Sequence, residues 1–254
     1  MTDKKTVQTK RGKKKAVLIV CLAVLFLCLV GIAVYFGDYY RSSDDVEQYF
    51  HENEGVSIIE IDDGLLLDGV GTESALIFYP GAKVEYTAYI PLLYQLAENG
   101  TDVFLVKMPL NFAIFGMNKA DDILSEYDYA HWYIGGHSLG GAMAANYAAD
   151  CLEDGNEYIE GLVLLAAYPT KSLAQSDMSV LSIYGSEDKV LNLEKVADGR
   201  SLMPENSKEI VIDGGNHAQF GCYGEQKGDG TALISGEAQR VQTVDVILEM
   251  INAK

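Results

Sequence analysis

The chain has 254 residues, of which 48% are apolar and 22% charged, and its formal net charge is -18. This composition excludes a disordered, collagen-like or disulfide-stapled chain, and the length suits one domain of ordinary to large size. Residues 1–15 hold seven basic side chains and one acidic one, so residues 37–254 carry 12 basic and 36 acidic side chains, a net charge of -24. A segment that acidic repels phosphate backbones, which argues against a nucleic-acid partner.

Residues 16–36 form an uncharged, apolar segment. As a helix it would span about 31 Å, the hydrocarbon thickness of a bilayer, so we interpret it as a transmembrane signal-anchor helix. The alternative is a cleaved signal peptide, since Gly31 and Ala33 are small enough for a cleavage site, but the segment exceeds the roughly 7–15 apolar residues of such a signal. The basic residues of 1–15 place that tail in the cytoplasm and everything after Phe36 outside the cell membrane.

Cysteine usage indicates neither a metal site nor a disulfide framework. Cys21 and Cys28 lie in the apolar segment, and only Cys151 and Cys222 lie in the exported part. No Cys-x-x-Cys or Cys/His cluster is present, so we expect no bound metal. Nothing local brings Cys151 and Cys222 together, and whether they pair stays open.

Residues 37–54 are polar and acidic and are interpreted as a juxtamembrane connector, with one short helix expected over 44–51. The acidic domain beyond it, residues 55–254, would be repelled by an anionic membrane surface. We therefore expect the connector to hold that domain away from the lipid.

In residues 55–254, apolar runs of strand length alternate with amphipathic stretches of helix length. Strands are predicted over 56–61, 65–67, 75–80, 102–109, 131–136, 161–169, 180–185 and 209–214, the first two as a hairpin around 62–64. Helices are predicted over 86–98, 120–127, 139–152 and from a cap at Ser235 to about 252. Continuous apolar strands separated by helices indicate an α/β fold, a mostly parallel central sheet with helices on both faces.

The strand over 131–136 leads into Gly136-His137-Ser138-Leu139-Gly140, followed by an alanine-rich helix. Gly-x-Ser-x-Gly between a strand and a helix is typical of a nucleophile elbow. The turn is so tight that side chains two residues either side of the serine would collide with the neighbouring strand or helix. Ser138 is therefore the candidate nucleophile.

A serine hydroxyl needs a base to remove its proton and an acid to orient that base. In such folds the acid and then the histidine follow later strands. Asp188 follows the strand over 180–185, with Glu187 in reserve, and His217 follows the strand over 209–214. The other histidines precede the sheet, begin a strand or lie inside the elbow: His51, His131 and His137.

The tetrahedral intermediate requires donors for its negative charge. One is the backbone N–H of Leu139, directly after the nucleophile. We expect the other from the N–H of Ala82, in the loop after the strand over 75–80, where Gly81 allows the backbone to turn. The His-Gly-Gly-Gly signature of many lipases is absent.

These motifs give the chain a family resemblance. From about Val56 to its end it resembles the alpha/beta-hydrolase superfamily, and it is similar to the small lidless fold-5 family, often described as dienelactone-hydrolase-like or carboxylesterase-like. The resemblance is carried by FYPGAKVE, VKMPLN, GGHSLGG, YGSEDKV and GGNHAQFG. It implies hydrolysis of ester-type bonds without a cofactor. Cys222 departs from the family's pattern, in which a polar or acidic residue is expected at this position, and it puts a thiol near His217.

The sequence thus predicts a membrane-anchored serine hydrolase that acts on a small-molecule or lipid-like ester through Ser138, Asp188 and His217. About ten residues separate 169 from 180, which leaves no room for a large cap there. We expect the apolar loop over 111–117 to supply Phe112 and Phe115 to an acyl or aromatic pocket, and the glycine-rich segment over 223–230 to hold His217 in place.

Two other functions fit the same sequence. One is a non-catalytic extracytoplasmic binding domain on this fold, although the intact triad argues against it. The other is a thioesterase or an acyltransferase that uses the same three residues.

Overall fold

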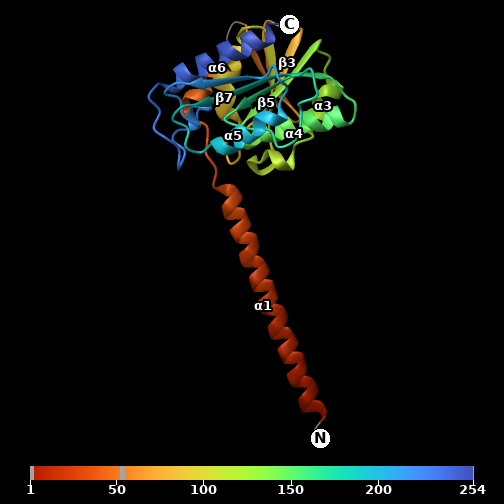
Figure 1. The fold of residues 1–254 in the computed structure, drawn as a ribbon. Helices are drawn as coiled ribbons and strands as arrows, with labels where there is room; N and C mark the ends of the chain where they lie inside the picture. Colours follow the sequence, from red (N-terminus) through yellow and green to blue (C-terminus); the bar gives the residue numbers. More distant parts are fainter. Residues whose placement is uncertain (1–2, 52–54, 254) are drawn as a thin grey trace. The chain divides into compact units, whose positions relative to one another are not determined.

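The computed structural model describes residues 3–51 and 55–253. The chain divides into two compact units, one ending at Asp38 and the other beginning at Tyr39 (Figure 1). The first unit is helix α1 (Asp3–Gly37). Its stretch Leu18–Gly37 is long and apolar enough to cross a membrane, and none of it is buried in the protein. This stretch fits a membrane anchor, and a signal sequence near an N-terminus can meet the same criteria.

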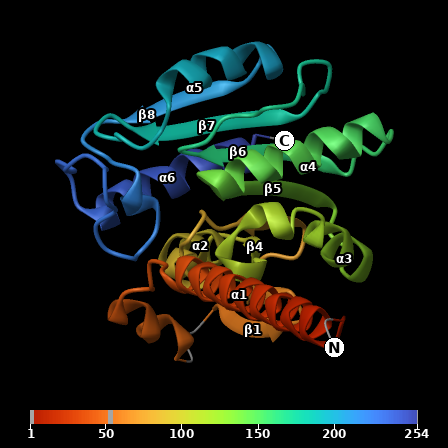
Figure 2. The ribbon, with the colours of Figure 1, turned by 90° about the horizontal axis from the view of Figure 1, so that it is seen from below.

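The second unit is built on one eight-stranded sheet with the order β1-β2-β4-β3-β5-β6-β7-β8. The predicted hairpin is confirmed, since β1 and β2 pair antiparallel around residues 61–64, and β2 is antiparallel to β4. The other neighbours are parallel, and β5 to β8 follow one another across the sheet (Figure 2). The strands are β1 (Ser57–Ile61), β2 (Gly64–Asp68), β3 (Ser74–Tyr79), β4 (Thr101–Val106), β5 (His131–His137), β6 (Ile159–Leu165), β7 (Ser179–Gly185) and β8 (Lys208–Ile212).

Every predicted helix is present, and the predicted α/β fold is confirmed. The segment 86–98 divides into a 3-10 turn and a helix, and the short helix α5 is an addition that the sequence did not predict. The α-helices of this unit are α2 (Ile90–Glu98), α3 (Lys119–Glu126), α4 (Leu139–Glu153), α5 (Leu193–Gly199) and α6 (Gly236–Ile251). The 3-10 helices are η1 (Asp44–Phe50), η2 (Tyr86–Tyr89), η3 (Pro109–Asn111), η4 (Ala113–Phe115), η5 (Arg200–Leu202) and η6 (Ala218–Phe220).

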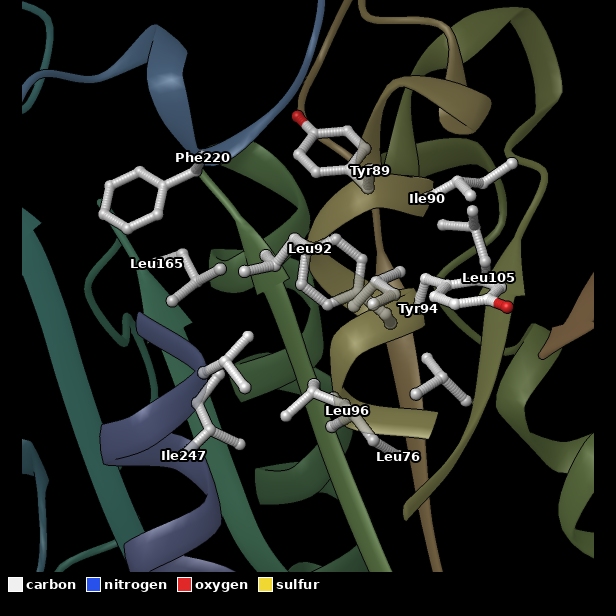
Figure 3. Close-up of a cluster of buried hydrophobic side chains, with 14 of the residues drawn as sticks. Leu76, Tyr89, Ile90, Leu92, Tyr94, Leu96, Leu105, Leu165, Phe220 and Ile247 are labelled. Atoms are coloured by element: carbon white, nitrogen blue, oxygen red, sulfur yellow. The ribbon is translucent and has the colours of Figure 1, made fainter. Parts of the chain in front are cut away.

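Two apolar clusters, one on each face, fix the sheet between its helices. Helices α2 and α6 contribute to one cluster, and α3 and α4 contribute to the other. In the first cluster, Leu92 and Leu96 of α2 lie with Ile247 of α6 and Leu165 of β6 (Figure 3). Full burial of such a side chain contributes roughly 1.5–3 kcal/mol relative to exposure. This packing sets the carboxyl ends of the parallel strands along one edge, where side chains from separate loops can meet.

The connector does not behave as a free spacer. Val46 of η1 is 3% exposed and belongs to the same apolar cluster as α2 and α6. The ring of Tyr49 packs edge-on against Tyr94, with centroids 5.1 Å apart, and the amide of Ser43 donates to the carbonyl of Cys222. The segment is therefore part of the folded domain, because its apolar side chains pack into the domain's own core.

Candidate active site

Ser138 occupies the turn between β5 and α4 in a strained backbone conformation, with φ 54° and ψ -122°. A non-glycine residue in such a region persists only where the surroundings fix it. Here the Ser138 amide donates to the carbonyl of Leu165 at 2.9 Å. A Cβ on Gly136 or Gly140 would lie 2.5 or 2.2 Å from the carbonyl oxygen of Tyr79, so glycine is required at both positions. Strand β3 therefore packs directly against the turn.

Asp188 and His217 form a buried pair from the loops after β7 and β8. His217 Nδ1 lies 2.8 Å from Asp188 Oδ2, and the two side chains are almost fully buried. The other carboxylate oxygen of Asp188 accepts from the amides of Val190 and Leu191, both at 2.8 Å. Since an ionised carboxylate can only accept, Nδ1 of His217 carries a proton, and in the neutral imidazole Nε2 is the nitrogen with the lone pair. The reserve residue Glu187 instead accepts from the Ser186 hydroxyl.

Ser138 and His217 line the same cavity, which has a volume of about 250 Å³. The elbow with the start of α4 and the loops after β6, β7 and β8 form its walls. Its lining residues are Ser138, Leu139, Ala142, Ala166, Ala167, Tyr168, Val190, Leu191, Asn192 and His217. The predicted nucleophile and base therefore share one space, with Asp188 behind the histidine.

The two predicted oxyanion donors are placed differently. Leu139 lines the cavity and begins helix α4, so its N–H is one of the helix's first, which have no acceptor within the helix. Ala82 does not line the cavity. The amides on either side of it are engaged, that of Gly81 by the Tyr89 hydroxyl at 3.0 Å and that of Lys83 by the carbonyl of Asn111 at 2.8 Å. These bonds fix the loop on both sides of the Ala82 amide.

His137 and Tyr89 form a buried connection that sequence reasoning missed. The Tyr89 hydroxyl accepts from the Gly81 amide and lies 2.7 Å from His137 Nδ1. The ring of His137 lies against that of His217, with centroids 4.5 Å apart. Burial, and to a smaller degree the nearby His217, hold the pKa of His137 well below its usual value, so this ring is neutral. The hydrogen bond between the Tyr89 hydroxyl and His137 Nδ1 joins the Gly81 loop to the elbow.

Asp229 holds the loops of Asp188 and His217 together. One of its carboxylate oxygens accepts from the amide of Ala218 at 2.9 Å, and the other is 3.3 Å from the amide of Lys189. The glycine-rich segment predicted to support His217 thus does so through an aspartate. No local sequence pattern marked this residue, because its partners lie in other loops.

Phe112 and Phe115 are not brought to the cavity, contrary to expectation. Their rings lie 6.2 Å apart in the loop between β4 and α3, and Phe115 is exposed. Cys222 is buried in the core cluster beside α2, where burial raises the pKa of its thiol. Cys151 and Cys222 are both free thiols.

A family model described as the alpha/beta hydrolase family matches residues 75–241. A predicted CIB-like hydrolase from Thermoplasma acidophilum is 16% identical, with a TM-score of 0.55 over 76% of this chain and 99% of that one. An esterase from Pyrobaculum calidifontis is 13% identical, with a TM-score of 0.56 over 81% and 88%. Carboxyl esterase 2 from the fungus Tuber melanosporum is 15% identical, with a TM-score of 0.56 over 82% and 91%. At these identities the likeness establishes the fold alone.

None of the curated proteins compared matches the chain.

The buried Tyr89 hydroxyl predicts a stability effect. Tyr89→Phe leaves the Gly81 amide and His137 Nδ1 without their partner, and we expect a loss of about 1–3 kcal/mol in unfolding free energy. Tyr94→Phe is the control, because the Tyr94 ring is also buried while its hydroxyl bonds to no described residue. Urea unfolding of the detergent-solubilised chain, followed by the single tryptophan, measures both. Equal losses for the two variants would contradict the assigned role.

Proposed function

The chain belongs to the alpha/beta hydrolase family, and from that premise we propose that it is a serine hydrolase of the carboxylesterase type. The observation that carries the proposal is the shared cavity of Ser138 and His217, with His217 hydrogen-bonded to Asp188. A hydroxyl at a strained strand–helix turn, a histidine with a free Nε2 lone pair and a buried carboxylate are the three groups that acyl transfer requires.

The proposed reaction proceeds in two steps. Ser138 Oγ attacks the ester carbonyl while His217 Nε2 takes its proton, and the N–H groups of Leu139 and Ala82 stabilise the oxyanion. When the intermediate collapses, the C–O bond breaks and His217 returns the proton to the departing alcohol, which leaves an acyl-enzyme on Ser138. Water then attacks in the same way and releases the acid. Asp188 stays ionised throughout and stabilises the imidazolium.

The cavity favours a short acyl group. Its walls near the nucleophile include three alanines, at 142, 166 and 167, and its volume is about 250 Å³. That is below the range of roughly 300–1,000 Å³ for pockets that enclose drug-sized ligands. The connection from Ala166 to Met178 has no helix or strand in the described structure, so loops alone bound this side. We propose that the alcohol part of the ester extends out of the cavity.

We further propose that residues 16–36 are an uncleaved signal anchor, with residues 1–15 cytoplasmic and residues 55–254 extracytoplasmic. The apolar stretch of α1 and the basic tail before it support this orientation.

A serine-directed fluorophosphonate provides the first test of the mechanism. It should label the wild type and fail to label Ser138→Ala, because alanine keeps the Cβ but removes the nucleophilic oxygen. Ser201→Ala is the control, since Ser201 is exposed in η5 and lies outside the cavity, and it should label like the wild type. Labelling of Ser138→Ala at the wild-type level would contradict the mechanism.

At low pH the esterase activity should be lost through a single protonation of the enzyme. His217 must be neutral to act as base, whereas the pKa of His137 is held so low that it adds no second ionisation. On the acid limb of the profile, we expect kcat/KM to fall about tenfold for each unit by which the pH is lowered. Initial rates from about pH 8 to 4 measure it, with folding monitored by tryptophan emission. A flat profile, or a slope of two in a folded enzyme, would contradict the assignment.

The anchor predicts the length of the mature protein. Intact-mass analysis of the membrane fraction should find the full chain of 27.7 kDa, because the apolar stretch is retained. A chain that begins after residue 33 would instead identify a cleaved signal peptide.

A further inference from the structure

The loop between β4 and α3 carries an exposed apolar surface at the catalytic edge of the sheet. The side chains of Leu110, Ile114 and Phe115 are 56%, 58% and 54% exposed. We call residues 110–115 the apolar loop. Large apolar side chains grouped in this way usually mark an interaction surface.

The shape of the apolar loop is fixed. Leu110 and Asn111 are consecutive non-glycine residues with positive φ, 54° and 57°. The carbonyl of Asn111 accepts from the amide of Lys83, which lies next to the candidate oxyanion donor Ala82. The apolar loop is therefore held against the loop that borders the site.

The same Lys83 also binds the chain that follows the apolar helix. The amide of Tyr40 donates to the carbonyl of Lys83 at 2.7 Å, and the amide of Glu85 donates to the carbonyl of Tyr40 at 2.8 Å. The Glu85 carboxylate in turn accepts from the amide of Ser42 at 2.9 Å. Tyr40, Lys83 and Asn111 thus form one continuous line of backbone hydrogen bonds.

Only Asp38 and Tyr39 separate Tyr40 from helix α1, whose stretch Leu18–Gly37 is long and apolar enough to span a bilayer. Two extended residues cover about 7 Å. Tyr40 is therefore tied by two residues to any membrane that holds this stretch.

The apolar loop itself carries no acidic side chain, although the domain as a whole is acidic. From Lys107 to Lys119 the chain has two lysines and no acidic residue; Lys119 is paired with Asp63, and Lys107 is exposed. Arg41, directly after Tyr40, is exposed, as are Asp38, Asp44 and Asp45 of the same segment. Long basic side chains such as Lys107 and Arg41 can reach lipid headgroups while apolar side chains contact the acyl chains below them.

We propose that the apolar loop inserts into the bilayer that anchors the chain, so that the mouth of the Ser138 cavity faces the lipid surface. The substrate class is then an ester of a short acyl group carried by a molecule that resides in the membrane. The substrate class depends on the proposed hydrolase function, whereas the insertion depends only on the anchor.

Insertion is tested on the full-length chain in vesicles of phosphatidylcholine and phosphatidylglycerol, with or without brominated acyl chains. Brominated lipid should quench the emission of Ile114→Trp beyond the wild type, whose Trp132 is buried. Tyr158→Trp is the control, because Tyr158 is exposed just before β6, at the opposite edge of the sheet, and it should not be quenched further. Absence of quenching at position 114, or equal quenching at both positions, would overturn the insertion.

The substrate class is tested with Leu110→Asn/Ile114→Asn, in which asparagine tolerates the positive φ of position 110. We expect kcat/KM for dioleoyl-acetylglycerol in those vesicles to fall about tenfold, the effect of losing ~1.4 kcal/mol of binding. Hydrolysis of soluble p-nitrophenyl acetate should be unchanged, and Val70→Asn, exposed before β3, should keep both activities.

Equal losses on both substrates, or no loss on the vesicle substrate, would overturn the substrate class. If the wild type hydrolyses neither substrate, the hydrolase function itself fails, and the quenching result still decides the insertion.

Discussion

The buried hydrogen bond between His217 and Asp188 is the interaction on which the candidate site depends. A carboxylate removed from water is tolerated only when its oxygens are occupied, and Asp188 accepts from the His217 ring and from two backbone amides. The two residues come from loops after adjacent strands, so the bond fixes one loop against the other. Asp229 strengthens the same junction through backbone amides of both loops. Fixed in this way, His217 presents its second nitrogen to the cavity that Ser138 lines.

The loop after β3 connects this site to the rest of the chain. On its inner side, Gly81 is bound by Tyr89, which reaches the neutral His137 behind the nucleophile. On its outer side, Lys83 is bound by Tyr40, from the segment that follows the apolar helix. One short loop thus contacts the elbow, the connector and the apolar loop, and this explains why the connector is packed into the domain. It also links the apolar loop, where we propose the membrane contact, to the elbow that carries Ser138.

The alternation of apolar runs and amphipathic stretches predicted the sheet and its main helices, because each core-facing element carries its own periodicity. Helix α5 escaped prediction because its seven residues, LEKVADG, carry too short an apolar pattern, and its start depends on the Asn192 side chain. The assignment of Phe112 and Phe115 to a pocket failed for another reason. Apolar side chains in a loop signal contact with something apolar, and the sequence does not say whether that is a substrate, the core or a membrane.

The sequence by itself determined the elbow, since Gly136, Ser138 and Gly140 act within one turn, and it determined the strand ends from which Asp188 and His217 project. The tertiary structure alone decided the hydrogen bond between Tyr89 and His137, which are 48 residues apart in the sequence. It also decided the one between Asp229 and Lys189, which are 40 residues apart. The physical reason is that periodicity encodes which face of an element is buried, whereas a hydrogen bond between two loops depends on distances and directions that exist only once the sheet has brought them together.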